Sequence, residues 1–277
     1  MRRMHLEALT VGGLVLVFAG TAPAASQALQ PHRAVYDLRL SESNDDADIE
    51  SLKGRWVFEF SGSECVGYTV KSRIVMHFAM TDGPRMIDQR ITSFEDARGE
   101  TFRFVTKSFI DQDDENVVEG TARLSEGKTV VDYTGPQKAQ HEFAPALFPI
   151  AQLKELLAKA AEGENFYQTR VFDGTEYVEE AVDVTVVLGK PRPVGEDDDE
   201  RKALGKLAED EFFPVTAAYF DNDSVGEQVS DYNVSFKLHE NGIQRDLLIR
   251  YTDYSMKADL VDIELFDEDR ECEVEAK

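Results

Sequence analysis

Segments in which apolar and polar residues alternate recur along almost the whole of this 277-residue chain. Alternation with a period of two is typical of β-strands with one buried and one solvated face. The pattern predicts strands at 34–40, 55–60, 68–80, 86–94, 102–110, 117–124, 165–172, 178–188, 212–220, 231–238, 245–253 and 260–266. About a dozen strands are more than one flat sheet holds comfortably. We therefore expect a mainly β fold, built as a strongly curved sheet, a barrel or a two-layer arrangement.

Short turns separate the first of these strands and show how they connect. Glycine lies among polar residues at 81–84, 97–100 and 125–128. Such turns are typical of antiparallel hairpins. Trp56, Phe58 and Phe60 share one side of their strand, and Phe102 and Phe104 repeat this arrangement. The first half of the chain is therefore predicted to be a meander of strands with one apolar face.

A single segment near the middle of the chain has the pattern of a helix. Residues 150–163 are rich in strong helix formers, with Pro149 suited to the first turn and Gly163 to the end. The apolar stripe of this helix consists of Ile150, Leu153, Leu156, Leu157 and Ala160. In a mainly β chain this stripe must lie on the sheet, either as part of the core or as a cover over a groove or barrel mouth. We take Ile150, Leu153, Leu156 and Leu157 as candidates for facing a ligand or partner.

The segment 189–211 interrupts the strand pattern. It begins with Pro191 and Pro193, which lack a backbone donor, and continues with the acidic residues 197–200. We expect a mobile acidic insertion within one domain that covers 29–277. A division into two domains at this point is the alternative.

The N-terminal residues 1–28 have the pattern of a cleaved secretory signal peptide. Arg2 and Arg3 precede a short apolar run at 14–19, and small residues follow at two candidate cleavage sites, so the mature chain begins near Ala25 or Leu29. Export through the general secretion pathway predicts a periplasmic protein. Because that compartment is oxidising, Cys65 and Cys272 are expected to form a structural disulfide rather than a redox-active pair, which usually has the spacing Cys-x-x-Cys.

The charge of the chain disfavours two classes of partner. The formal net charge is −24, and removal of the signal peptide makes it one unit more negative. Nucleic acids and anionic membrane surfaces are repelled by such a charge. Runs of acidic residues are taken as solvated loops. A calcium-loop candidate at 221–226 fails the EF-hand pattern, because Val225 occupies a ligand position.

Residues that could carry catalysis are sparse. The histidines beyond the signal segment have no metal-ligand spacing, and there is no Gly-x-Ser-x-Gly elbow and no glycine-rich phosphate loop. We expect no enzyme activity, no metal and no cofactor.

Several blocks of sequence support a resemblance to a known family. They lie at 56–68, 147–149, 171–174, 218–221 and 236–242, and the terminal Cys272 belongs with them. In these blocks the chain resembles the cell-envelope integrity protein EipB family of alphaproteobacteria, over essentially all of the mature sequence. The resemblance implies a monomeric, non-enzymatic periplasmic protein that supports the envelope under stress. It implies a β-spiral of two curved antiparallel sheets around a central helix, and a disulfide between Cys65 and Cys272. It also implies a periplasmic partner made of tetratricopeptide repeats.

Three functions follow as hypotheses. A scaffold or interaction protein of the envelope is the leading one. A carrier of lipid or lipoprotein is the second, and it requires an apolar cavity beneath the helix at 150–163. An enzyme that acts on envelope polymers is the third, and a concave cluster of carboxylates would favour it.

Overall fold

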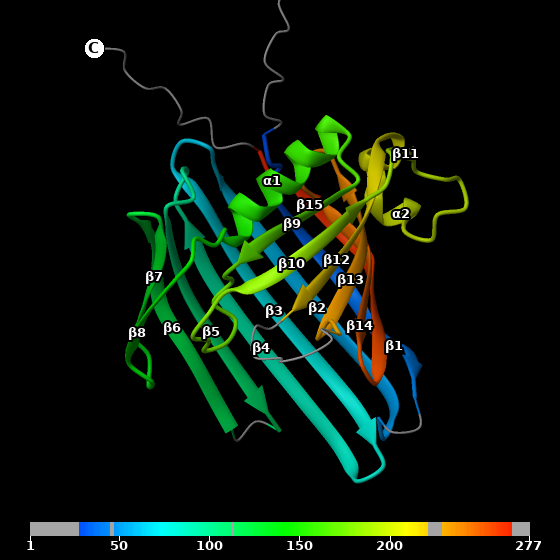
Figure 1. Ribbon diagram of the computed structural model, residues 1–277. Coiled ribbons are helices and arrows are strands. Elements are labelled where there is room, and N and C mark those ends of the chain that lie inside the picture. Colours follow the sequence, from blue (N-terminus) through cyan, green and yellow to red (C-terminus); the bar gives the residue numbers. More distant parts are fainter. Residues whose placement is uncertain (1–27, 45–46, 112–113, 221–228, 268–277) are drawn as a thin grey trace, which may run out of the picture.

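One continuous antiparallel sheet forms most of the protein. The computed structural model describes residues 28–44, 47–111, 114–220 and 229–267, and Figure 1 shows their arrangement. The elements in chain order are β1 (His32–Ser43), β2 (Ile49–Ser63), β3 (Gly67–Met80), β4 (Gly83–Glu95), β5 (Thr101–Ile110), β6 (Asp114–Ser125), β7 (Lys128–Tyr133), β8 (Ala139–Phe143), α1 (Pro149–Glu162), β9 (Phe166–Val171), β10 (Val182–Leu188), β11 (Arg192–Pro193), α2 (Arg201–Leu204), the 3₁₀ helix η1 (Gly205–Glu209), β12 (Glu211–Phe220), β13 (Tyr232–His239), β14 (Gln244–Tyr251) and β15 (Tyr254–Leu265). The mainly β fold with a central helix is confirmed.

The structure has one strongly curved sheet, which the strand pattern allowed, in place of the two sheets that the family resemblance implied. The fifteen strands form one sheet in the order β8-β7-β6-β5-β4-β3-β2-β1-β15-β14-β13-β12-β10-β9, with β11 beside β12. The two halves are joined because the last strand, β15, pairs with the first, β1, from His32 opposite Leu265 to Ser43 opposite Tyr254. A prediction from local pattern alone could not identify this long-range pair.

The sheet curls into an open ring (Figure 1). Its edge strands are β8 and β9, at the two ends of the strand order. The chain after β8 bridges part of the gap, since the Leu147 amide donates to the Arg170 carbonyl at 2.8 Å and the Phe172 amide donates to the Leu147 carbonyl at 3.0 Å. The ring is therefore bridged by one short segment without being closed by a full strand pair.

The side chains on the inner face follow the predicted alternation. Phe60, Phe102 and Phe104 are all buried. Trp56 and Phe58 are partly buried and pack against the main core cluster. The shorter strands β7 and β8 were not predicted. They continue the meander, with Val131 of β7 buried among the inner aromatic side chains.

The segment 189–211 was predicted as a mobile loop, and the structure corrects this. It carries β11, α2 and η1. Leu204 and Leu207 of this segment are buried in the main core. Glu200, from the acidic run that was taken as solvated, is only 4% exposed. Apolar anchors and a buried carboxylate hold the segment on the sheet.

Candidate binding cavity

A cavity of about 400 Å³ lies inside the ring, between α1 and the inner face of the sheet. Its wall comes from β1 to β4 on one side and from β12 to β14 on the other, with α1 between them. Most of the lining side chains are aliphatic or aromatic. Such a cavity suits an apolar or amphipathic molecule.

The predicted helix forms α1, and the structure assigns its four candidate residues to two environments. Ile150, Leu153 and Leu156 line the cavity. Leu157 does not line it and instead packs, partly buried, against the core clusters. The helix ends as predicted at Gly163, which has φ of 76° in the left-handed region. The apolar stripe of α1 therefore serves both as core and as the cover of a cavity.

The N-terminus of α1 is held by a residue that the sequence analysis did not identify. Glu95, at the end of β4, accepts hydrogen bonds from the amides of Ile150 at 2.8 Å and Ala151 at 2.7 Å. Phe148 occupies the N-cap position and has no side-chain acceptor, so the Glu95 carboxylate caps the helix in its place. Glu95 is only 2% exposed, and this burial raises its pKa to about 7 against the two hydrogen bonds, which act to lower it.

One wall of the cavity is aromatic. Trp56 stacks on Tyr36 with ring centroids 4.9 Å apart and meets Phe58 edge to face at 5.9 Å. The indole Nε1 of Trp56 donates to the Ser72 hydroxyl at 2.8 Å, so its polar atom is satisfied inside an apolar site. Trp56 is the only tryptophan of the chain. It is therefore a natural reporter for anything that enters the cavity.

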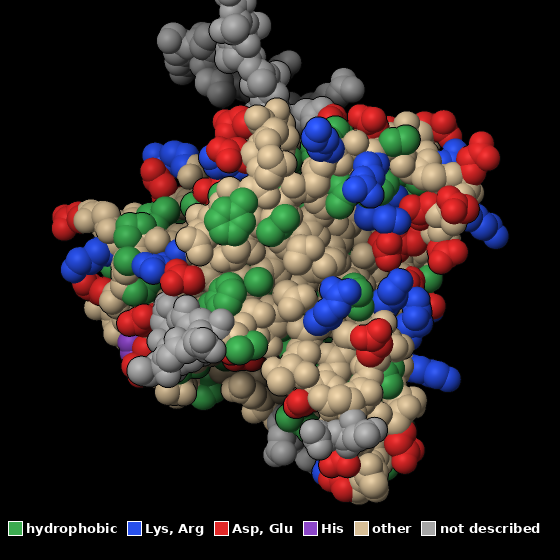
Figure 2. All heavy atoms as spheres, turned by 45° about the vertical axis from the view of Figure 1, so that its right-hand side comes forward, with side chains coloured by type: hydrophobic (Ala, Val, Ile, Leu, Met, Phe, Trp, Pro, Cys, Tyr) green, Lys and Arg blue, Asp and Glu red, His purple; other side chains and the backbone are tan. Residues whose placement is uncertain are grey.

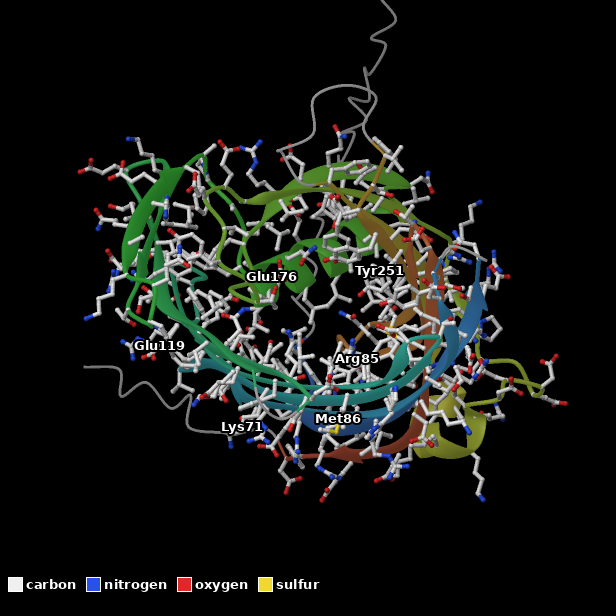
Figure 3. All side chains as sticks on the ribbon, turned by 90° about the horizontal axis from the view of Figure 1, so that it is seen from below. Lys71, Arg85, Met86, Glu119, Glu176 and Tyr251 are labelled. Carbon is white, nitrogen blue, oxygen red and sulfur yellow. The ribbon has the colours of Figure 1, made fainter. Side chains whose placement is uncertain are left out.

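A ladder of tyrosines crosses the strands β12 to β15. Tyr219 stacks on Tyr232 with centroids 4.5 Å apart, Tyr232 meets Tyr251 at 5.8 Å, and Tyr251 stacks on Tyr254 at 4.9 Å. Figure 3 shows Tyr251 on the inner side of the ring, whereas Lys71 points away from it. Burial raises the pKa of Tyr219 to about 12, so its hydroxyl stays neutral at physiological pH. Tyr219 and Tyr232 both line the cavity.

Asp173 reaches the cavity from the connection between β9 and β10. It lies in a turn that is fixed by Gly174, which has φ of 67° and whose missing Cβ would lie 2.5 Å from the ring of Phe104. The Thr106 hydroxyl donates to the Gly174 carbonyl at 3.0 Å. Oδ1 of Asp173 accepts from the amide of Thr175 at 2.9 Å and from its hydroxyl at 2.8 Å. The turn thus has little freedom and presents one carboxylate to the cavity.

A second polar cluster lies beneath the segment 189–211 and is structural. The fully buried guanidinium of Arg245 pairs with Asp198 at 3.0 Å and with Glu200 at 2.9 Å. Nε of Arg245 donates to Nε2 of His239 at 2.9 Å. Burial, aided by the charge of Arg245, lowers the pKa of His239 to about 4, so His239 is neutral and accepts this bond. Because Glu200 also accepts the Asp246 amide at 3.0 Å, the cluster fastens the segment to β14.

The remaining predicted sites lie partly outside the described residues. Cys65 lies in the exposed turn between β2 and β3, whereas Cys272 is outside them, so their disulfide stays a prediction. The signal peptide, except Ala28, and the rejected calcium loop at 221–226 are also outside them. Within the described ranges there is no cluster of three or more His, Cys, Asp or Glu side chains arranged to hold a metal ion.

Comparisons with known proteins agree with this architecture. A family model described as EipB-like matches residues 23–267. The cell envelope integrity protein EipB of Brucella abortus (strain 2308) is 43% identical over 272 residues, which cover 96% of each chain. A crystal structure of a β-barrel-like protein with a domain of unknown function, DUF1849, also from Brucella abortus, matches with a TM-score of 0.82 and 42% identity. The match covers 86% of this chain and 99% of that one.

No helix among the described residues is long and apolar enough to cross a membrane. The family model and the 43% identical relative each match most of the chain. The chain belongs to the EipB-like family.

Proposed function

We propose that this protein supports the integrity of the cell envelope by holding an apolar or amphipathic molecule, such as a lipid or the acyl chain of a lipoprotein, in the cavity beneath α1. It acts in the periplasm and catalyses no reaction. The relative from Brucella abortus is named for cell envelope integrity, which supports the envelope role. The cavity of about 400 Å³ is the observation that carries the binding role.

The cavity has the size and lining that a lipid chain requires. Ligand pockets in proteins are commonly roughly 300–1,000 Å³ and mainly apolar. The side chains of Leu153 and Leu156 line the cavity from α1 and leave it unfilled. Burial of an acyl chain contributes about 0.8 kcal/mol for each methylene removed from water. An acyl chain of moderate length would therefore gain enough from burial to bind in this cavity.

A scaffold role is the second candidate, and an exposed apolar pair on the edge of the sheet favours it. Phe166 of the edge strand β9 is 58% exposed, and its cross-strand neighbour Val187 is 49% exposed. On the face that Figure 2 shows, hydrophobic side chains are exposed in small groups among charged ones. An edge strand with exposed apolar side chains suits a protein partner, and a periplasmic tetratricopeptide-repeat protein is the partner we propose for it.

One experiment distinguishes the two candidates. The mature protein is captured from its own periplasm, and both the bound proteins and the extracted lipids are identified by mass spectrometry. We expect lipid in the wild type and much less in Ala217→Phe, because Ala217 lines the cavity and is 4% exposed. Ala158→Phe, at an exposed position of α1, is the matched control and should retain the lipid. Recovery of a repeat protein without lipid would instead support the scaffold.

A further inference from the structure

The charged side chains that line the cavity are of one sign only. In the part of the chain that the structure describes, the lining includes the carboxylate of Asp173 and no lysine or arginine. His32 also lines the cavity, with its Nδ1 2.7 Å from the Gln30 carbonyl. Burial lowers the pKa of His32, so it carries no charge at neutral pH. The lining therefore carries negative charge and no positive charge.

Asp173 lies at the entrance of the cavity, where a polar head group would lie. Its side chain lines the cavity and is also exposed to solvent. The turn that holds it is rigid, because Gly174 is packed against Phe104 and bonded to Thr106. A preorganised carboxylate loses little conformational entropy when it binds a charged group.

Tyrosine rings lie on the same cavity wall. Tyr219 and Tyr232 both line the cavity and stack on each other, with an interplanar angle of 11°. Aromatic faces attract ammonium groups, and such attraction increases when water is excluded. A carboxylate together with tyrosine rings is a chemical environment that recognises alkylammonium cations.

One basic side chain on this inner face of the sheet, Arg85, is already paired with carboxylates. Arg85 shares the face of β4 that carries Ile91, a cavity residue, and Figure 3 shows it on the inner side of the ring. Its guanidinium pairs with Asp82 and with Asp111, each at 3.3 Å. Arg85 does not line the cavity. A phosphate or carboxylate head group in the cavity would meet Asp173, and no lysine or arginine among the described lining residues would offset the repulsion.

We propose that the ligand of this cavity is an amphiphile with an ammonium head group. Its alkyl chain lies against α1 and the aromatic wall at Trp56, and its ammonium group lies near Asp173 and the rings of Tyr219 and Tyr232. This inference rests on the proposed function and specifies its ligand class.

Three probes with the same alkyl chain test the head group. Decyltrimethylammonium, decyl maltoside and decyl sulfate are titrated below their micelle concentrations, and binding is followed by the fluorescence of Trp56. We expect the ammonium probe to bind roughly fivefold to tenfold more tightly than the other two, as a carboxylate and a cation–π contact at a partly desolvated site would give. Equal affinities, or tighter binding of the sulfate, would overturn the ammonium inference while leaving the proposed function intact. Binding of none of the three would overturn both.

A matched pair of variants separates the site from the general negative charge of the protein. Asp173→Asn removes the carboxylate charge and retains the Oδ1 acceptor of the turn, so it should weaken only the ammonium probe, by roughly threefold to tenfold. Glu211→Gln makes the same change in net charge at an exposed position that does not line the cavity. It should leave all three affinities unchanged. An equal loss in both variants would show that the ammonium probe is attracted by net charge alone and would overturn the inference.

Discussion

Glu95 shows how a single buried residue can connect two elements that are distant in sequence. Its carboxylate caps α1 from the end of β4, so the position of the helix over the cavity depends on a strand that ends 54 residues before the helix begins. The sequence shows only that Phe148 is a poor cap. The sequence does not show which residue caps the helix instead, because a carboxylate that comes from another element produces no recognisable motif next to the helix.

The titration of Glu95 gives a prediction with a definite sign. Its pKa rises from 4.5 to about 7 on folding, so the stability that comes from its proton is complete below pH 4.5 and is lost as the pH rises through 7. In Glu95→Gln this contribution cannot titrate. From pH 5 to pH 8 the wild type should therefore lose about 2 to 3 kcal/mol of unfolding free energy relative to the variant. Urea unfolding followed by circular dichroism at several pH values measures it.

Glu100→Gln is the control for this change. Glu100 lies in the same turn region, with its side chain 49% exposed and paired to Arg98. Its variant should keep the pH dependence of the wild type. Parallel stability profiles for wild type and Glu95→Gln would show that Glu95 does not titrate in this range.

At the scale of elements, the sequence pattern predicted the helices and strands that are determined by residues adjacent in the chain. The helix was predicted at 150–163 and observed at Pro149–Glu162, because its formers, its proline and its terminal glycine are adjacent in sequence. The segment 189–211 was misjudged because Asp198 and Glu200 resemble a solvated acidic run. Their partner, Arg245, lies 45 residues after Glu200, and only tertiary structure brings the charges together. The sequence pattern did not predict the cavity itself; a cavity was expected only if the protein carries lipid or lipoprotein.

The buried ion pair of this segment gives a prediction of its own. Arg245→Met leaves Glu200 and Asp198 without their buried cation, and the loss of one partner of such a pair typically costs about 3–5 kcal/mol. Arg39→Met is the matched control, because Arg39 pairs with Asp259 at the surface and its side chain is 52% exposed. We expect it to cost about 1 kcal/mol or less. Chemical unfolding of both variants tests this, and equal losses would show that the cluster is not a structural anchor.

For the whole molecule, the pairing of β1 with β15 is what makes one sheet out of two meanders. It also places the end of β15 near the part of β2 that leads into the turn between β2 and β3. His32 of β1 lies opposite Leu265 on one side and opposite Phe60 on the other. Leu265 of β15 and Phe60 of β2 are therefore two strand spacings apart, about 10 Å. Cys65 follows Phe60 by five residues, and Cys272 follows Leu265 by seven, which can span roughly 23 Å. The predicted disulfide requires no rearrangement of the strands.

A disulfide between Cys65 and Cys272 would tie the last strand to the β2–β3 turn and so protect the one pairing that joins the halves. On the chain-entropy model a loop of this size contributes up to about 5 kcal/mol. The double variant Cys65→Ser/Cys272→Ser should therefore melt below the oxidised wild type, by up to roughly 10–20 °C. Reduced wild type should melt with the variant, and the variant itself should not respond to reductant. An unchanged melting temperature would mean that the β1–β15 ladder alone holds the ring together, and peptide mapping without reduction would then decide whether the bond forms at all.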